Sequence, residues 1–143
     1  MIVLDTNVVS ELWKITPDPH VVAWIDAQAI ESLYLSAVTV AEIRFGLATM
    51  PTGKRRTIYQ DRFEREVLSA FTGRVLPFDL DATQAYADLM ARAQVAGKAI
   101  DKTDGYIAAI AAARGLIVAT RDVSPFRATG VDVIDPWSFC RPP

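Results

Sequence analysis

Two aspartates follow the most apolar short runs of the sequence. Asp5 comes directly after the run 2–4, and Asp122 is the third residue after the run 117–119. An unpaired buried charge is costly, so acids in such surroundings need a reason. In an open parallel sheet the carboxyl ends of the strands face the crevice where ligands bind. Two acids at that edge, with no histidine nearby, indicate a site for a hard cation.

Two further acids fall on apolar faces of helical patterns. Glu42 shares a face with Val38 and Phe45 at helical spacing. Asp104 opens a second helical pattern, and the same face continues with small and branched apolar residues, Ile107, Ala108 and Ala111. We expect both faces to be largely buried, and we expect the helix that begins at Asp104 to carry this acid toward the sheet.

Each acid also has an ordinary structural interpretation. Thr39 and Glu42 match a capping box, in which the glutamate returns to the backbone of the threonine. Asp101 could cap the following helix, which would leave the acid three residues later as a favourable first-turn charge. The two aspartates after strands could form Asx turns. These interpretations do not explain why both apolar strands end in aspartate, or why both helical acids share apolar faces.

The remaining reactive side chains narrow the chemistry. His20 follows Pro19 at an expected helix start and is expected at the surface, and Cys140 is the single cysteine, with no histidine partner. No Ser–His pair and no glycine-rich phosphate loop is present, which disfavours acyl transfer and NTP hydrolysis. Clustered carboxylates without bases suit Mg²⁺ or Mn²⁺. Such a site can activate water and stabilise charge on a phosphodiester.

The composition is that of a packed globule. The chain has 143 residues, 51% of them hydrophobic, and we expect one domain over residues 1–143. No apolar run approaches the length of about 20 residues that a membrane span needs, and the first residues form an apolar strand instead of a signal peptide. A lone cysteine excludes an intrachain disulfide, so we expect a cytoplasmic protein.

The net charge of −2 gives no general attraction to nucleic acid, so any such contact must be local. One basic cluster could supply it, and it consists of Lys54, Arg55, Arg56, Arg62 and Arg65. A solvated helix start explains the same cluster equally well. The three tryptophans, at positions 13, 24 and 137, are candidates for an interface, although core packing is the expected role for most of them.

Strand patterns alternate with helical patterns along the chain. The expected strands are 2–4, 33–35, 75–76, 116–119 and 133–134. One expected helix begins near residue 19. The other expected helices cover 40–50, 57–71, 82–95 and 103–114. Such alternation implies crossover connections, and so an α/β fold: a three-layer sandwich around a central, mostly parallel sheet. This sheet would bring the four acids to one edge.

These segments together resemble the PIN-domain family, and within it the VapC/FitB-like toxins of bacterial toxin–antitoxin pairs. The resemblance rests on five segments in the family's order, namely 3–7, 39–43, 76–78, 104–109 and 118–122. They span nearly the whole chain. Any one of them alone is weak, whereas their order and spacing together are specific.

The resemblance implies a ribonuclease that depends on Mg²⁺ or Mn²⁺. It implies that the metal-binding and catalytic acids are Asp5, Glu42, Asp104 and Asp122, with polar support from Thr6, Asn7 and Thr120. Such proteins cut RNA, are typically homodimers, and are held inactive by a small antitoxin that binds DNA, so DNA is contacted only through the antitoxin. Lys102 beside the third acid could contact a phosphate, but we treat it as structural.

Three other functions are compatible with parts of the pattern. A phosphoryl-transfer enzyme of the haloacid dehalogenase kind usually has a second aspartate where this chain has Asn7. A receiver-like switch needs a lysine where this chain has Thr120 and Arg121. A catalytically silent PIN-fold binding module, acting through its antitoxin and DNA, would have no use for four mutually repelling carboxylates.

Overall fold

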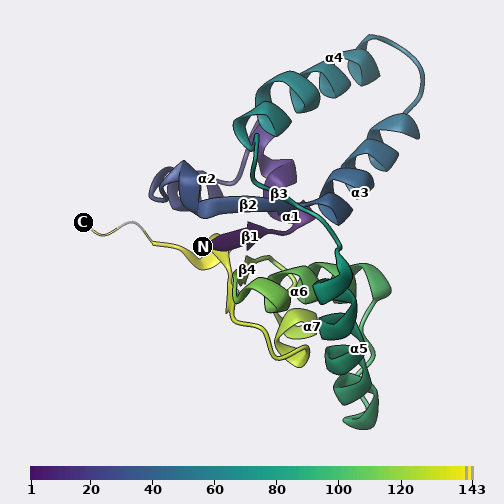
Figure 1. Cartoon of the computed structure of the whole chain (residues 1–143). Helices are drawn as coiled ribbons and strands as arrows, with labels where there is room; N and C mark the ends of the chain where they lie inside the picture. The colour runs from purple at the N-terminus through teal and green to yellow at the C-terminus, as the bar shows by residue number, and fades with distance from the viewer. Residues whose placement is uncertain (141, 143) are drawn as a thin grey trace.

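Five short parallel strands form the centre of the structure, a computed structural model that describes residues 1–140 and 142 (Figure 1). In spatial order they are β3 (Val75–Leu76), β2 (Leu33–Ser36), β1 (Ile2–Leu4), β4 (Ile117–Ala119) and β5 (Val133–Ile134). Every neighbouring pair is parallel. The prediction of a mostly parallel α/β sheet is therefore confirmed. The order places β1 in the middle, so Asp5 emerges at the centre of one edge.

Helices cover both faces of this sheet and make it the middle layer of three (Figure 1). One face carries α1 (Thr6–Ser10), α2 (Pro19–Asp26), α3 (Ala37–Ala48) and α4 (Lys54–Arg62). The other face carries α5 (Leu80–Val95), α6 (Lys102–Arg114) and α7 (Val123–Ala128). The short helical turns η1 (Glu11–Trp13), η2 (Ile30–Ser32) and η4 (Pro136–Ser138) connect these elements.

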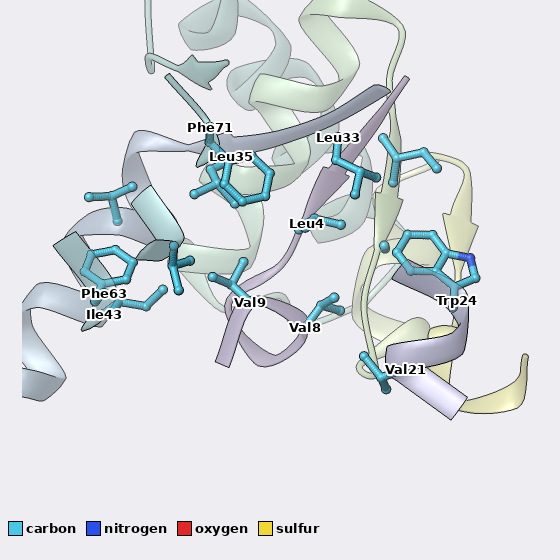
Figure 2. Close-up of a cluster of buried hydrophobic side chains, with 14 of the residues drawn as sticks. Leu4, Val8, Val9, Val21, Trp24, Leu33, Leu35, Ile43, Phe63 and Phe71 are labelled. Carbon is cyan, nitrogen blue, oxygen red and sulfur yellow. The ribbon is translucent and has the colours of Figure 1, made fainter. Parts of the chain in front are cut away.

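The sheet separates two apolar clusters because successive strand side chains point to opposite faces. Leu4 belongs to the cluster under α1 to α4, and Val3 belongs to the cluster under α5 to α7. Figure 2 shows the first cluster, where Phe63 and Trp24 fill the space between helices and sheet. Trp24 is 3% exposed, and Trp13 and Trp137 pack partly buried against the same cluster. The expectation that the tryptophans serve core packing is confirmed.

Side-chain caps start the helices earlier than the sequence pattern indicates. Ser36 accepts a hydrogen bond from the Thr39 amide and starts α3 at Ala37, three residues before the predicted start. Asp79 accepts from the Ala82 amide in the same way at the start of α5. Both residues satisfy backbone N–H groups that a helix start leaves free, so the helix can begin before the apolar pattern does.

Three features of the fold were not predicted. The helices α1 and α7 directly follow Asp5 and Asp122, and their five and six residues are too short to show a periodic pattern. The predicted helix 57–71 begins at Lys54 and continues beyond α4 as a π-helical segment, η3 (Phe63–Leu68). Its two inward residues, Phe63 and Val67, are buried.

Among the described residues, no helix combines the length and apolar character that crossing a membrane requires.

Candidate active site

Asp5 ends β1 and is almost completely buried, with 4% of its surface exposed. One carboxylate oxygen accepts the Thr6 amide at 2.8 Å and the other accepts the Thr120 hydroxyl at 2.8 Å. Burial raises the pKa of this carboxyl, the hydrogen bonds from Thr120 and Thr6 lower it, and the charges of Glu42 and Asp122 raise it. The net direction is upward. Asp5 thus caps α1, a helix that was not predicted, and also belongs to a cluster of charges.

Thr120 and Asn7 connect Asp5 to Asp122 across the β1–β4 pair. The Thr120 hydroxyl accepts the Asp122 amide at 3.0 Å while it donates to Asp5. The Asn7 amide group donates to Asp122 Oδ2 at 3.3 Å and lies 3.5 Å from the Thr120 hydroxyl. The strands hold these residues together because Leu4 and Ala119 are direct partners in the sheet. The structure therefore brings the predicted supporting residues into one network with two of the predicted acids.

Glu42 lies on α3 and points to the same network. Its Oε1 accepts the Thr6 hydroxyl at 2.6 Å, and that hydroxyl lies 3.3 Å from the hydroxyl of buried Thr39. The capping-box interpretation is wrong, because Ser36 caps this helix and Thr39 lies inside it. The predicted burial is also wrong. Glu42 is exposed and Phe45 is 71% exposed, because this face of α3 turns away from the sheet.

Asp104 lies in the first turn of α6, which Asp101 caps by accepting the Thr103 amide at 3.3 Å. That cap was predicted and is confirmed. Asp104 itself is half-buried, and its pKa rises to about 6. The largest cause is burial, followed by the charges of Asp5, Asp101, Asp122 and Glu42. Because these charges affect the pKa of Asp104, the four predicted acids lie near enough to interact electrostatically.

Close helix packing fixes α6 in this position. A side-chain carbon added at Gly105 would come within 2.8 Å of the Met90 sulfur and 3.1 Å of the Tyr86 ring on α5. Glycine therefore lets α5 and α6 approach closely beside Asp104. The residues that follow Asp104 along the predicted face are buried, namely Ile107, Ala108 and Ala111. The predicted burial of this face is confirmed.

The chemistry of the four acids fits a hard divalent cation. Each of the five ion pairs in the described part of the chain uses another acid, so no basic side chain there neutralises this cluster. Oxygen ligands of this kind are the ones that Mg²⁺ and Mn²⁺ prefer. Within residues 1–140 and 142, however, no three acidic, histidine or cysteine side chains already converge tightly enough to ligate one ion.

Several other candidates lie away from this edge or have structural partners. Arg62 donates to the Trp13 carbonyl at 3.1 Å, and Arg65 pairs with Asp61 at 2.8 Å, so part of the basic cluster supports helix packing. Lys102 is exposed at the first position of α6. His20 is exposed, as predicted, and its Nδ1 lies 2.9 Å from the Phe139 carbonyl.

Thr39 is the network residue that the sequence interpretation misassigned. Its side chain is fully buried, and its hydroxyl meets that of Thr6. The available signal was a serine at the end of a strand followed by a threonine three residues later, which together predict a capped helix start with a buried hydroxyl.

Comparison with known proteins shows which family this architecture belongs to. The family model described as "PIN domain" matches residues 2–131. The chain belongs to the PIN-domain family. This PIN domain is 71% identical over 137 residues to "VapC ribonuclease Y4jK" of Sinorhizobium fredii, covering 96% of this chain and 98% of that protein. It is 47% identical over 137 residues to "Toxin FitB" of Neisseria gonorrhoeae, covering 96% of this chain and 99% of that protein.

A solved structure supports the same assignment. A chain in "Structure of FitAB bound to IR36 DNA fragment" superposes on this PIN domain with a TM-score of 0.93 and 45% identity, over 99% of each chain. The similarity therefore covers the whole fold, including all five strands and the acid-bearing edge. The resemblance to VapC/FitB-like PIN domains, inferred from five short segments, is confirmed.

Proposed function

We propose that this PIN domain is a metal-dependent endoribonuclease and the toxin of a toxin–antitoxin pair. The observation that carries the proposal is that four acids lie near enough to interact electrostatically at one edge of a PIN-domain sheet, without an ion-pair partner among the described residues. The printed names of its relatives, a VapC ribonuclease and the toxin FitB, support both halves of the proposal.

Asp5, Glu42, Asp104 and Asp122 would hold Mg²⁺ or Mn²⁺. When bound, such an ion supplies Lewis-acid stabilisation of the phosphodiester and lowers the pKa of a water molecule. Because these side chains do not already converge, binding an ion would draw them together. Burial and, after it, repulsion by the neighbouring acids raise the pKa of Asp104, and the ion would offset both costs.

The residues around the acids orient them. Thr6 donates to Asp5 through its amide and to Glu42 through its hydroxyl, so one residue fixes a strand acid and a helix acid together. Thr120 and Asn7 do the same for Asp5 and Asp122. Hydrolysis needs the water oxygen to bond to phosphorus in line with the P–O bond that breaks. Fixed carboxylates favour this alignment because they limit where a substrate phosphate can sit.

We also propose that a small antitoxin binds this chain and inhibits it, and that DNA is contacted only through that partner. A FitAB complex at 45% identity and a member of the VapBC family of toxin–antitoxin systems at 29% identity are among the structural neighbours and support an antitoxin. Exposed Phe45 on α3 and Leu80 on α5 are apolar side chains of the kind that a homodimer would cover. Co-expression with a candidate antitoxin, followed by purification, tests for the antitoxin, and light scattering of the purified protein tests for the homodimer. A protein that is always isolated alone would contradict the first proposal, and a monomeric protein would contradict the second.

The direct test is cleavage of a structured RNA by the purified protein with Mg²⁺, Mn²⁺ or EDTA. We expect cleavage only with metal, and a loss of more than about 100-fold in Asp5→Asn, because several kcal/mol of charge stabilisation is removed. Asp101→Asn is the matched control, since asparagine also caps helices and keeps α6 in place.

Full activity in Asp5→Asn would refute the carboxylate site. If no metal gives cleavage and Mn²⁺ leaves the melting temperature unchanged, the chain is a binding module that acts through its antitoxin. We expect the activity in the cytoplasm, where RNA is available as a substrate.

A further inference from the structure

One basic side chain stands among the acids at the carboxyl edge of the sheet. The three residues that follow each strand are 5–7, 37–39, 77–79, 120–122 and 135–137. Of these fifteen positions, Arg121 is the one that carries a lysine, arginine or histidine. It directly precedes Asp122, and β4 places it beside the end of β1. Among the residues that directly follow the strands, Arg121 is therefore the single positive side chain, and the proposed metal chemistry does not use it.

The structure holds Arg121 by two contacts that leave its charge available. Its backbone amide donates to the Asn7 side-chain oxygen at 3.3 Å, which ties it to the polar network. Its guanidinium lies over the Trp137 ring, with Cζ 5.3 Å from the ring centroid. A cation over an aromatic face is attracted by the ring without using its N–H groups in a hydrogen bond, so those groups stay free to donate.

Trp137 is itself fixed from two sides. Its backbone amide donates to the Asp135 side chain at 2.9 Å, which caps η4 directly after β5. Its ring packs partly buried against the apolar cluster below α1 to α4. Since β4 and β5 are paired, the arginine and its aromatic support come from adjacent strand ends of the same edge. The ring is thus a stable surface for a side chain that would otherwise move freely.

An arginine that served only to neutralise the acids would be expected to pair with one of them. In residues 1–140 and 142, Arg121 makes no ion pair, although it is adjacent to Asp122 in sequence and stands at the same edge as Asp5. It remains exposed. With a net charge of −2, the protein has no general attraction to a polyanion. A phosphate would therefore gain the most binding free energy at a local cation beside the acids.

We propose that Arg121 binds a phosphate of the RNA strand beside the carboxylates, and that Trp137 is the positioning residue that holds it there. The proposal rests on the ribonuclease function proposed above and deepens it by assigning the substrate-phosphate contact. A guanidinium can bind a phosphate through two parallel N–H donors, which fixes orientation as well as charge. The substrate would then be held by an arginine on one side of the site and by the acid cluster on the other.

RNA binding in EDTA tests the assignment without cleavage. The probe is a fluorescent single-stranded RNA of 12 random nucleotides, which is adequate because phosphate contacts carry no sequence information. Anisotropy is measured from low to moderate salt for the full-length wild type, Arg121→Gln and Arg127→Gln. Arg127 is exposed in the last turn of α7, away from the acid edge, so its variant changes the net charge equally.

We expect Arg121→Gln to bind the RNA about tenfold more weakly than wild type, which corresponds to one charge-assisted contact. The slope of log Kd against log salt should fall by about 0.7, the value for one phosphate on a single strand. Arg127→Gln should change neither quantity. Equal binding by the two variants, or no RNA binding by the wild type, would overturn the proposal.

Two Trp137 variants test the positioning role. Trp137→Phe keeps an aromatic face and should retain most of the binding, whereas Trp137→Leu keeps apolar bulk and should lose several-fold. Melting temperatures identify any loss of folding. If the leucine variant folds and binds like wild type, Trp137 does not position the arginine.

Cleavage with Mn²⁺ separates the two proposals. Metal-dependent cleavage that is equal in Arg121→Gln and Arg127→Gln would remove the arginine from the site and leave the ribonuclease intact. Cleavage that survives in Asp5→Asn would remove the carboxylate mechanism, whatever the arginine does.

Discussion

Asp5 and Asp104 serve the same cluster but are held in opposite ways. Asp5 ends a central strand, is 4% exposed, and receives two hydrogen bonds that favour its charged form. Asp104 begins a helix, and all the causes acting on its pKa, burial and four neighbouring acids, raise it. The pKa of both acids is raised, but the strand acid has hydrogen bonds that offset part of the burial cost of its charge, and no cause acting on the helix acid favours its charged form.

The difference shows where a cation would contribute most. At Asp5, hydrogen bonds from Thr6 and Thr120 already offset part of the burial cost. At Asp104, an ion would replace repulsion by attraction with no competing donor. We therefore expect the strand half of the cluster, Asp5 and Asp122, to be ordered without metal. In the helix half, Glu42 and Asp104, we expect the charged form of Asp104 to be stabilised only when metal is bound. Four measurements test this difference between the two acids.

The largest effect should come from removing the hydroxyl that joins the strand acids. Thr120→Val keeps the side-chain shape but removes the donor to Asp5 and the acceptor for the Asp122 amide. We expect cleavage to fall by about 10- to 100-fold, as for other groups that orient metal ligands. Thr120→Ser keeps the hydroxyl and should stay near wild type. A valine variant with wild-type rates would mean that the network does not position the acids.

Metal should stabilise the wild type measurably. At 100-fold excess over its Kd, a bound ion adds about 2.7 kcal/mol to the free energy of unfolding, which corresponds to a rise in Tm of roughly 5 to 10 °C. Thermal melts with Mn²⁺ and with EDTA measure it. The shift should be lost in both Asp5→Asn and Asp104→Asn. A shift that persists in Asp104→Asn would show that the helix half does not bind the ion.

Without metal, neutralising the helix acid should stabilise the protein more than neutralising the strand acid. Asp104→Asn removes repulsion and should raise the free energy of unfolding by on the order of 1 kcal/mol, since solvent screens a half-buried group. Asp5→Asn should gain less, because its hydrogen-bonded charge is already partly stabilised. Urea titrations in EDTA at pH 7 give both values. The reverse order would contradict the comparison.

The same repulsion should appear as a dependence of stability on pH. The pKa of Asp104 is raised from 3.8 to about 6, so its contribution to stability is fully present below about pH 4 and is lost as the pH rises through 6. The advantage of Asp104→Asn over wild type in EDTA should therefore vanish near pH 4 and reach on the order of 1 kcal/mol above pH 7. An advantage independent of pH would point to packing instead.

The features that repeat along the chain could be predicted from it. All five strands, the parallel sheet and the long helices follow from apolar runs and helical spacing, and the strand acids follow from their place after β1 and β4. The starts of α3 and α5 could not be placed, because a serine or aspartate cap acts through one hydrogen bond and leaves no periodic signal. The short helices α1 and α7 were missed because five and six residues are too few to show a periodic pattern.

The side-chain environment of the helix acids was the harder problem. Apolar neighbours at helical spacing predicted burial for both, and this held for the face that continues from Asp104 but not for Glu42, whose neighbour Phe45 turns outward. Periodicity shows that residues share a face, whereas the angle at which a helix crosses the sheet decides whether that face is covered. The contact of Arg121 with Trp137 depends on the β4–β5 pairing, which sequence spacing does not reveal.

The position of β1 between β2 and β4 has a consequence for the moment at which the site forms during synthesis. Asp5 leaves the ribosome before its hydrogen-bond partner Thr120, which follows 115 residues later. A nascent chain that lacks β4 has three of the four acids but not the hydroxyl that Thr120 donates to Asp5. Because domains fold as units, the proposed nuclease site is completed only after β4 has emerged. Fragments released early by abortive translation should therefore be harmless to the cell that makes them.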